Sequence, residues 1–298
     1  MEIGRLLTPM VTPFDDEGQV DYEQARRLAR ALLDSGSDGL VIAATTGEGP
    51  TLTNDEKLKL FAAVKEAVNG RAAVIAGTGT NNTAASIELS QETERIGVDG
   101  LLLTVPYYNK PTQDGLYRHF EAIARATRLP CILYNIPSRT GVNMTAETTL
   151  RLSRMPNIVG IKESSGDLVQ IARIIDDAGD DFRLWSGDDA LTLPILAIGG
   201  YGVIAVVSHL AGVQLHRIID DYLAGRTADA ASGHRRLLPL MQTLMTAASN
   251  PAPVKYALNQ VGFRVGAPRL PLVEPEGDAA ERIMAEVRRS RIDLAVAV

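Results

Sequence analysis

Eight short apolar runs recur along the chain, and the segments between them place apolar residues at helical spacing. Two of these segments, residues 22–36 and 54–70, end in glycine, as helix C-termini often do. Strands that are apolar on both faces and alternate with amphipathic helices indicate a parallel sheet covered by helices. Eight such repeats predict a closed (β/α)8 TIM barrel. The runs span residues 6–11, 39–44, 72–77, 100–105, 131–136, 158–162, 182–187 and 202–207.

A doubly wound open sheet is the alternative fold for this pattern, but its dinucleotide-binding fingerprint is incomplete. The segment GTGTNN (77–82) has the first two glycines of that fingerprint and lacks the third, so we interpret it as a turn. After about Arg226 the helical pattern continues without strands, with breaks at 250–255 and 267–272. We therefore predict a barrel over residues 1–225 and a C-terminal helical extension over residues 226–298.

Composition indicates a soluble enzyme with small-molecule partners. The chain has 298 residues, of which 45% are hydrophobic and 22% charged, as is ordinary for a globular protein. Its net charge of -6 and the absence of a long Lys/Arg cluster argue against binding to nucleic acid or an anionic membrane. Because no segment reaches the roughly 18 apolar residues of a spanning helix, and the first residues lack a signal-peptide pattern, we expect a cytoplasmic protein.

The pattern of cysteine and histidine favours neither a disulfide nor a metal site. Cys131 is the single cysteine and lies inside an apolar run, which predicts a buried, inert thiol in place of a nucleophile. The histidines do not form a spaced ligand set, and no phosphate loop or GxSxG elbow is present. We expect no metal and no cofactor. The histidines are His119, His209, His216 and His234.

Lys162 closes an apolar run, NIVGIK (157–162), where a buried strand is expected to end. A lysine in this position either extends its amine to solvent or has a function, and the C-terminal strand ends of a barrel form its active site. A lysine near hydroxyls and without a metal suggests Schiff-base chemistry on a carbonyl compound. The attacking amine must be neutral, so we expect burial to lower its pKa well below the ordinary value of about 10.4.

Other polar residues follow the predicted strands and are expected at the same end of the barrel. Thr45 and Thr46 either bind a small carboxylate or form a helix N-cap turn. Tyr108 and Tyr134 are phenols that either relay protons or pack at the edge of the core. Arg139 lies in a proline-containing loop and can bind a carboxylate through two hydrogen bonds, although a surface arginine without that role is the alternative.

Eight motifs resemble, in order and over most of the chain, those of the pyruvate-dependent Schiff-base lyases and synthases, specifically the dihydrodipicolinate synthase (4-hydroxy-tetrahydrodipicolinate synthase) family. The resemblance implies a class I aldolase-type lyase that condenses pyruvate with aspartate 4-semialdehyde to give 4-hydroxy-tetrahydrodipicolinate, in lysine and diaminopimelate biosynthesis. The motifs are TPMVTPF (8–14), TTGE (45–48), GTGTNNT (77–83), PYYNKP (106–111), YNIPSRTG (134–141), GIKESSGD (160–167), SGDD (186–189) and GGYGVIAV (199–206).

The resemblance also implies a role for each candidate residue. Lys162 would form the imine with pyruvate, and Tyr134 would donate and accept protons at that imine. In similar enzymes the second tyrosine of PYYNKP reaches across a tight dimer interface, and two dimers form a homotetramer. The remaining implied roles are proton relay by Thr45 and Tyr108, binding of pyruvate by Thr46 and the backbone of Ile204, and binding of the aspartate semialdehyde carboxylate by Arg139.

Two alternative functions use the same fold. A Schiff-base aldolase that releases pyruvate from a 2-keto-3-deoxy sugar acid or N-acetylneuraminate would use the same lysine and tyrosine, but such lyases usually lack an arginine matching Arg139. A non-catalytic barrel that retains the lysine is an alternative from another class. The departures from the family pattern are Ala44, where glycine is usual, and Gly49, where serine is common, and both affect packing of the TTGE loop.

A further departure concerns regulation. Family members inhibited by lysine have a glutamate at the position of Ala85 and often a histidine at that of Lys57. A methyl group in place of a carboxylate, together with an added cation, opposes binding of a cationic amino acid. We therefore predict weak or absent feedback inhibition by lysine.

Overall fold

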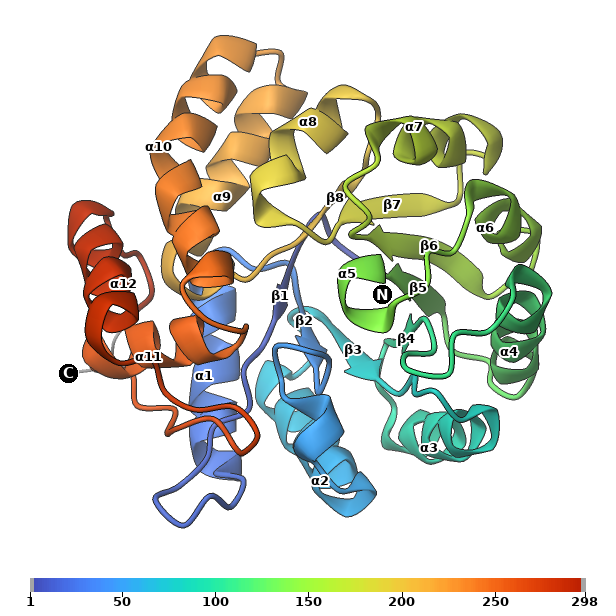
Figure 1. Ribbon diagram of the computed structural model, residues 1–298, viewed down its shortest axis with the longest axis horizontal. Helices are drawn as coiled ribbons and strands as arrows, with labels where there is room; N and C mark the ends of the chain where they lie inside the picture. The colour runs from blue at the N-terminus through green and yellow to red at the C-terminus, as the bar shows by residue number, and fades with distance from the viewer. Residues whose placement is uncertain (1–2, 296–298) are drawn as a thin grey trace. The chain divides into compact units, whose positions relative to one another are not determined.

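In the computed structural model, which describes residues 3–295, eight parallel strands form a closed barrel in chain order (Figure 1). Each strand lies within a predicted apolar run or extends it by one residue, so the predicted (β/α)8 fold is confirmed. The strands are β1 (Leu6–Pro9), β2 (Gly39–Ile42), β3 (Ala73–Gly77), β4 (Gly100–Thr104), β5 (Cys131–Asn135), β6 (Ile158–Glu163), β7 (Arg183–Ser186) and β8 (Gly202–Ile204).

The strands are buried along almost their whole length, as expected for a sheet with apolar residues on both faces. Every residue of β5 is buried, including Cys131, whose side chain is fully inaccessible. Burial raises the pKa of this thiol to about 12, so the predicted buried and unreactive cysteine is consistent with its surroundings.

The connecting helices begin at side chains that cap them. Asp21, Thr53 and Asn82 each accept a hydrogen bond from a backbone N–H in the first turn of the helix that follows. Thr53 and Glu56 form a complete capping box. These helices are α1 (Tyr22–Asp34), α2 (Asn54–Val68), α3 (Thr83–Ile96), α4 (Gln113–Arg125), α5 (Pro137–Thr140), α6 (Ala146–Leu152), α7 (Leu168–Asp177) and α8 (Thr192–Ala197), with short 3-10 turns η1 (Gly49–Thr51) and η2 (Asp189–Leu191).

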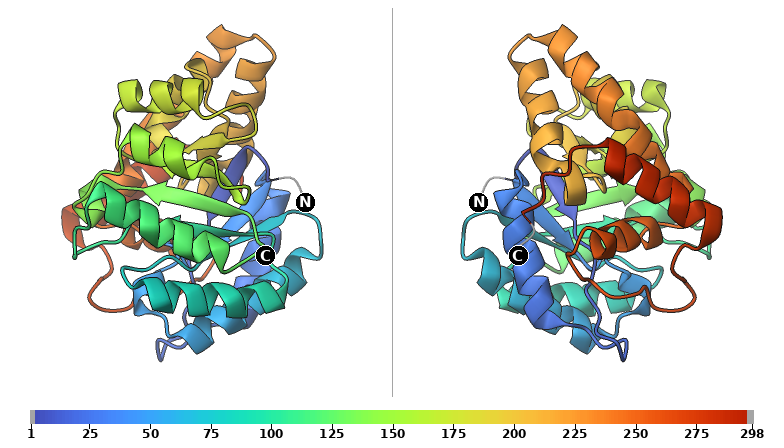
Figure 2. Two further views of the ribbon diagram at one scale, coloured as in Figure 1. Left: turned by 90° about the vertical axis from the view of Figure 1, so that its right-hand side faces the viewer. Right: turned by 90° about the vertical axis from the view of Figure 1, so that its left-hand side faces the viewer.

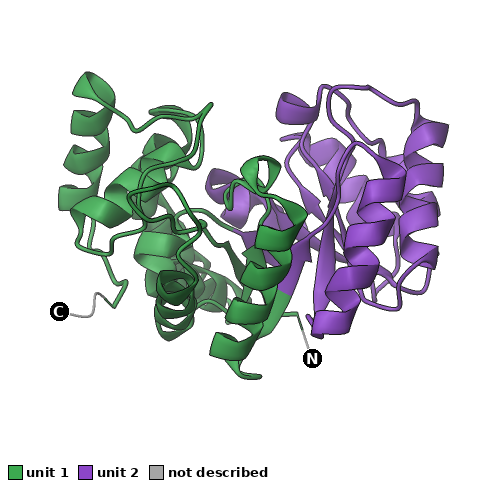
Figure 3. Cartoon of the chain, turned by 90° about the horizontal axis from the view of Figure 1, so that it is seen from below, with its two compact units in different colours: residues 1–74, 205–298 green, residues 75–204 purple. Residues whose placement is uncertain are grey.

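The chain divides into two compact units, coloured separately in Figure 3. The first unit comprises residues 1–74 and 205–298, and contains α9 (Ser208–Leu223), α10 (Thr227–Thr246), α11 (Ala252–Gln260) and α12 (Gly277–Arg289). Within it, α10 packs against both α9 and α12 (Figure 2). The helical content after Arg226 agrees with the predicted extension, and the predicted boundary between residues 225 and 226 stays a prediction. Within residues 3–295, no helix is both long and apolar enough to span a membrane.

The second unit, residues 75–204, contains the strand ends at which Lys162 is found. In Figure 1 the helices α3, α4, α6 and α7 lie on the outer side of β4–β7. The register of β5 and β6 places Tyr134 opposite Lys162, and Asn135 opposite Glu163. Two pairs of polar side chains are thus brought together at the carboxyl ends of adjacent parallel strands.

Candidate active site

Lys162 and Tyr134 are in direct contact. The Nζ atom of Lys162 lies 4.3 Å from the centroid of the Tyr134 ring, and the two residues are only 5% and 3% exposed. Within residues 3–295, Lys162 forms no ion pair and donates no hydrogen bond from its side chain. The amine is therefore buried beside a phenol without a carboxylate partner, which excludes the alternative of a lysine extended into solvent.

Gly187, the residue directly after β7, provides the space that the Lys162 side chain occupies. A Cβ atom on Gly187 would lie 3.0 Å from Cε and 3.1 Å from Cγ of Lys162, closer than such contacts normally are. The same Cβ would overlap the Oγ atom of Ser164. The backbone N–H of Gly187 donates to the carbonyl of Glu163 at 2.8 Å, which holds the two chain segments together.

Arg139 lies on the short helix α5, directly after β5. The sequence predicts a stiff loop here, and the structure resolves that loop into a single helical turn that begins at Pro137 and ends at Gly141. The turn is anchored by Thr140, whose buried hydroxyl donates to the carbonyls of Ile136 and Val142. The Arg139 side chain is exposed and has no hydrogen bond or ion pair within the described residues, so its guanidinium is available to an anion.

A buried acid next to Lys162 was not among the predicted site residues. Glu163 is 1% exposed, and both of its carboxylate oxygens accept hydrogen bonds from Nδ2 of Asn135, at 3.2 and 3.0 Å. Burial raises the pKa of Glu163, and the hydrogen bonds from Asn135 and Ser165 oppose that effect. Asn135 belongs to the motif YNIPSRTG and Glu163 to the motif GIKESSGD, so the sequence contains a signal for both. The motifs alone do not indicate that these two side chains are hydrogen-bonded to each other.

Tyr108 and Ile204, two further predicted site residues, differ in exposure to solvent. Tyr108 is 88% exposed and has φ of +74°, in the left-handed region that non-glycine residues seldom adopt. The next residue, Asn109, fixes this turn by donating from Nδ2 to the carbonyl of Asn81 at 2.9 Å. Ile204 is the last residue of β8 and is 1% exposed. Within residues 3–295, neither Tyr108 nor Ile204 forms a hydrogen bond with Lys162.

Thr45 and Thr46 lie in the other compact unit, in the turn that follows β2. Thr46 is 3% exposed, and its Oγ1 atom accepts a hydrogen bond from Nδ2 of Asn250 at 2.9 Å. Within residues 3–295 the hydroxyl hydrogen of Thr46 has no acceptor, so it is available to donate to a bound group. The departure at Gly49 has a steric reason, since a Cβ there would lie 2.1 Å from the carbonyl oxygen of Ala43.

The same turn is held by an ion pair with no exposed surface. Nζ of Lys255 lies 2.9 Å from Oε1 of Glu48 and also donates to the carbonyls of Thr12 and Ala267, at 3.0 Å each. The other oxygen of Glu48 accepts from the backbone N–H of Arg269 at 2.8 Å. The sequence pattern predicts only a break in the helices at residues 250–255, and the Asn and Lys within that break are the signal for both contacts.

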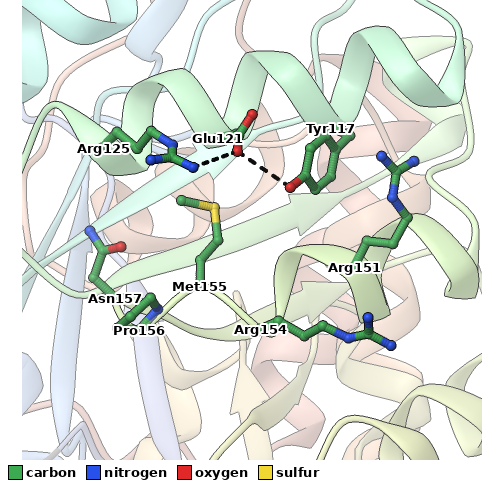
Figure 4. A pocket seen from close by; sticks show the side chains of 8 residues that line it. All are labelled: Tyr117, Glu121, Arg125, Arg151, Arg154, Met155, Pro156 and Asn157. Atoms are coloured by element: carbon green, nitrogen blue, oxygen red, sulfur yellow. Dashed lines mark hydrogen bonds and ion pairs between the residues drawn. The ribbon is translucent and has the colours of Figure 1, made fainter.

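The hollow shown in Figure 4 lies elsewhere in the second unit. It has a volume of about 440 Å³ and is bordered by α4 and by residues 151–157, which precede β6. Its arginines are partly matched, since Arg125 pairs with Glu121 at 2.9 Å and Arg151 stacks on the ring of Tyr117 at 4.0 Å. The hollow is at the amino end of β6, whereas Lys162 is near the carboxyl end, and it contains none of the predicted site residues.

A (β/α)8 barrel with a buried lysine and a phenol on adjacent strand ends, the lysine having no ion pair among residues 3–295, has the features of the class I aldolase-type enzymes, which react through a lysine Schiff base. The sequence matches the family model of the dihydrodipicolinate synthetase family over residues 2–290, and the chain belongs to this family.

Curated relatives support the same assignment. The chain is 57% identical to the 4-hydroxy-tetrahydrodipicolinate synthase of Dehalococcoides mccartyi strain CBDB1 over 295 residues, which cover 99% of each protein. It is also 57% identical to that of Moorella thermoacetica, over 97% of this chain and 99% of the relative.

Solved structures agree in fold. The dihydrodipicolinate synthase of Bacillus anthracis has a TM-score of 0.95 and 42% identity, covering 97% of this chain and 98% of that one. The enzyme of Cyanidioschyzon merolae, solved with lysine bound, has a TM-score of 0.95 and 46% identity, covering 96% and 98%.

Proposed function

We propose that this protein is a 4-hydroxy-tetrahydrodipicolinate synthase, a class I aldolase-type lyase that condenses pyruvate with aspartate 4-semialdehyde. Its curated relatives carry that name at identities of 52–57% over nearly their whole length. The contact between the Lys162 amine and the Tyr134 ring is the structural observation that carries the proposal. The product, 4-hydroxy-tetrahydrodipicolinate, places the protein in the biosynthesis of diaminopimelate and lysine.

The first half-reaction takes place at Lys162. Its neutral amine attacks the ketone carbon of pyruvate, and loss of water gives an imine whose protonated form withdraws electrons. A methyl proton is then lost to give the enamine, which is the carbon nucleophile. Tyr134 is adjacent to the amine and transfers protons at this centre, with Thr45 and Tyr108 as relay partners.

The second half-reaction requires an anionic aldehyde to be held beside the enamine. Arg139 has an exposed guanidinium without a partner in residues 3–295, and it binds the carboxylate of aspartate semialdehyde. Thr46 and the backbone of Ile204 hold the carboxylate of pyruvate. After the new carbon–carbon bond forms, the amino group of the second substrate displaces Lys162 by transimination and closes the six-membered ring.

The alternative, an aldolase acting on a 2-keto-3-deoxy sugar acid or N-acetylneuraminate, is not favoured by the relatives' names. The two activities can be compared directly by measuring turnover of aspartate semialdehyde with pyruvate and of the sugar acids alone. Arg139→Ala should impair the condensation strongly and leave any cleavage of sugar acids unaffected.

The nucleophile can be tested by reductive trapping. Incubation of the protein with pyruvate and borohydride should give a stable adduct at Lys162, identified by peptide mass spectrometry. Lys162→Ala should give no adduct, and Lys162→Arg is the control that keeps the positive charge. Absence of an adduct in the unmodified protein would contradict the proposed function.

We further infer a cytoplasmic homotetramer built as a dimer of dimers. The exposure of Tyr108, 88% within one chain, supports an assembly in which a second copy covers this side chain. The similar structures include a monomeric dihydrodipicolinate synthase variant, with 41% identity and a TM-score of 0.93. Sedimentation velocity should give a mass four times that of the chain, and a monomer with full activity would contradict this assembly.

A further inference from the structure

Behind the carboxyl ends of β5 and β6 lies a polar cluster that the proposed mechanism does not use. We name it the Asn135 cluster, and it consists of Asn135, Asn143, Glu163 and Gln170. Asn135 and Glu163 are 0% and 1% exposed. Buried polar side chains carry a large desolvation cost unless they are hydrogen-bonded, so the contacts within this cluster determine how the local backbone is held.

Glu163 is the acceptor at the centre of the cluster. Its carboxylate accepts from Nδ2 of Asn135 and from the backbone N–H of Ser165, the latter at 2.6 Å. Nε2 of Gln170 lies 3.5 Å from Oε2, at the outer limit of a hydrogen bond. Every close neighbour of the carboxylate is thus a donor, and an acceptor is required at this position.

Asn135 links this carboxylate to the chain on the far side of Arg139. Its Oδ1 atom accepts from the backbone N–H of Met144 at 3.0 Å, and Nδ2 donates to Oδ1 of Asn143 at 2.7 Å. An amide nitrogen has only two hydrogens, so the carboxylate on one side and Asn143 on the other fix its orientation. Residues 136–143 therefore form a loop whose two ends are held by one side chain.

Arg139 lies near the middle of that loop, and its own side chain contributes nothing to holding it, since it has no partner within residues 3–295. Gln170 of α7 supports the outer end of the loop by accepting from Nδ2 of Asn143 at 2.8 Å. Gln113 of α4 adds a second outer contact by donating from Nε2 to the backbone carbonyl of Asn143 at 2.8 Å. The position of the guanidinium thus depends on the base of the loop, where the Asn135–Glu163 pair is the buried contact.

We propose that Glu163, acting through Asn135, is a positioning residue that places Arg139 to bind the carboxylate of the aldehyde substrate. This inference rests on the proposed function. It predicts a selective effect, because the loop carries the group for the second substrate, whereas Lys162 and Tyr134 are held by the strands themselves.

The principal variant is Glu163→Gln, which keeps the size of the side chain and replaces one acceptor by a donor. The KM for aspartate semialdehyde should rise about 10-fold or more, as expected when a binding group is misplaced. Borohydride trapping of pyruvate at Lys162 should stay within about twofold of the unmodified protein. The control is Glu94→Gln, because Glu94 of α3 is also a carboxylate that accepts hydrogen bonds, from Thr127 and Arg128. These two partners precede β5 and lie outside the loop of residues 136–143.

A double-variant comparison separates positioning from a general structural role. If Glu163 acts through Arg139, Glu163→Gln should raise the KM for aspartate semialdehyde in the unmodified protein and have no further effect in the Arg139→Ala background. The double variant N135D/E163Q exchanges the donor and the acceptor, and it should bind aspartate semialdehyde more tightly than Glu163→Gln alone. Asn143→Ala removes the bonds of Asn143 to Asn135 and Gln170 and keeps the bonds between Asn135 and Glu163, so it should raise the same KM by a smaller factor, even if Glu163→Gln does not fold.

Equal losses in pyruvate trapping and aldehyde affinity would overturn the proposal, as would an unchanged KM in both Glu163→Gln and Asn143→Ala. Independent effects of Glu163→Gln and Arg139→Ala would also overturn it. Failure of the proposed function is a distinct result, because the unmodified protein itself would then form no pyruvate adduct and no condensation product.

Discussion

Gly187 and Lys162 pack so closely that the smallest added side chain would meet the lysine, with a Cβ 3.0 Å from its Cε atom. Gly187→Ala should therefore displace the amine by a few tenths of an ångström and lower kcat/KM by roughly 10- to 100-fold. The backbone at Gly187 is outside the left-handed region, so strain comes only from side-chain contacts, and the overlap with Oγ of Ser164 should lower the melting temperature as well.

The contact with Ser164 provides the control for Gly187→Ala. The pair S164A/G187A removes the overlap with the serine hydroxyl and keeps the contact with Lys162. The double variant should remain impaired in steady-state assays. Recovery of full activity would assign the effect to Ser164 and contradict an effect on the lysine.

Tyr134 contributes its ring and its hydroxyl to the site, and the two contributions can be separated. Tyr134→Phe keeps a ring beside the Lys162 amine and removes the hydroxyl that we propose as the proton-transfer group. We expect kcat to fall by about 10² to 10⁴, the usual contribution of general acid–base catalysis, while the fold remains stable. A kcat within twofold of the unmodified protein would exclude the phenol from proton transfer.

The pH dependence of stability should include a contribution from His216. Its Nε2 atom lies 3.1 Å from Oδ1 of Asp38, and this hydrogen bond, opposed by partial burial, raises the pKa of His216 to about 9. Asp38 also accepts from the backbone N–H groups of Arg5 and Leu6, so the pair anchors the chain at the start of β1.

Because the folded-state pKa of His216 is above the unfolded value of about 6.5, its contribution is complete below pH 6.5 and is lost as the pH rises through 9. The two side chains are 34% and 30% exposed, so we expect only about 1 kcal/mol after allowing for solvent screening. Urea unfolding should show the protein more stable than His216→Gln at pH 6, with the difference gone near pH 10. A constant difference across that range would contradict the assignment.

The sequence predicted the strands and helices, which have strong local patterns. It missed the pairs of polar side chains that have no local pattern. Apolar runs located all eight strands, and the position of Lys162 at the end of one run located a buried lysine beside Tyr134, whose role as the nucleophile stays a prediction. Asn250 contacts Thr46, which is 204 positions away in the sequence, and Lys255 contacts Glu48, which is 207 positions away. Such contacts have no periodicity, because they depend on how distant segments pack, so only the structure identified them.

The buried ion pair of Glu48 and Lys255 should be sensitive to loss of one partner alone. Lys255→Met leaves Glu48 uncompensated at 0% exposure, a change that usually costs about 3–5 kcal/mol. The pair E48Q/K255M removes both charges and should be less destabilised than Lys255→Met in chemical denaturation. Equal stability of the two variants would show that the charge on Glu48 is satisfied without the lysine.

Feedback by lysine is the property in which this chain is expected to differ from some relatives, since the similar enzyme of Cyanidioschyzon merolae was solved with lysine bound. Ala85 lies in the first turn of α3, where its backbone N–H is capped by Asn82, and it offers a methyl group where inhibited members have a carboxylate. Lys57 on α2 is 8% exposed, and burial lowers its pKa. Neither side chain supplies the anion that an ammonium group requires.

We therefore expect condensation by the unmodified protein to be insensitive to submillimolar lysine. Ala85→Glu restores the missing carboxylate and should increase sensitivity to lysine, most clearly when combined with Lys57→His. Ala84→Glu is the matched control, because it adds the same charge to the same helical turn one position away and should leave the inhibition curve unchanged. Half-maximal inhibition of the unmodified protein by submillimolar lysine would contradict the prediction, since a cationic inhibitor would then bind without the carboxylate on which the argument depends.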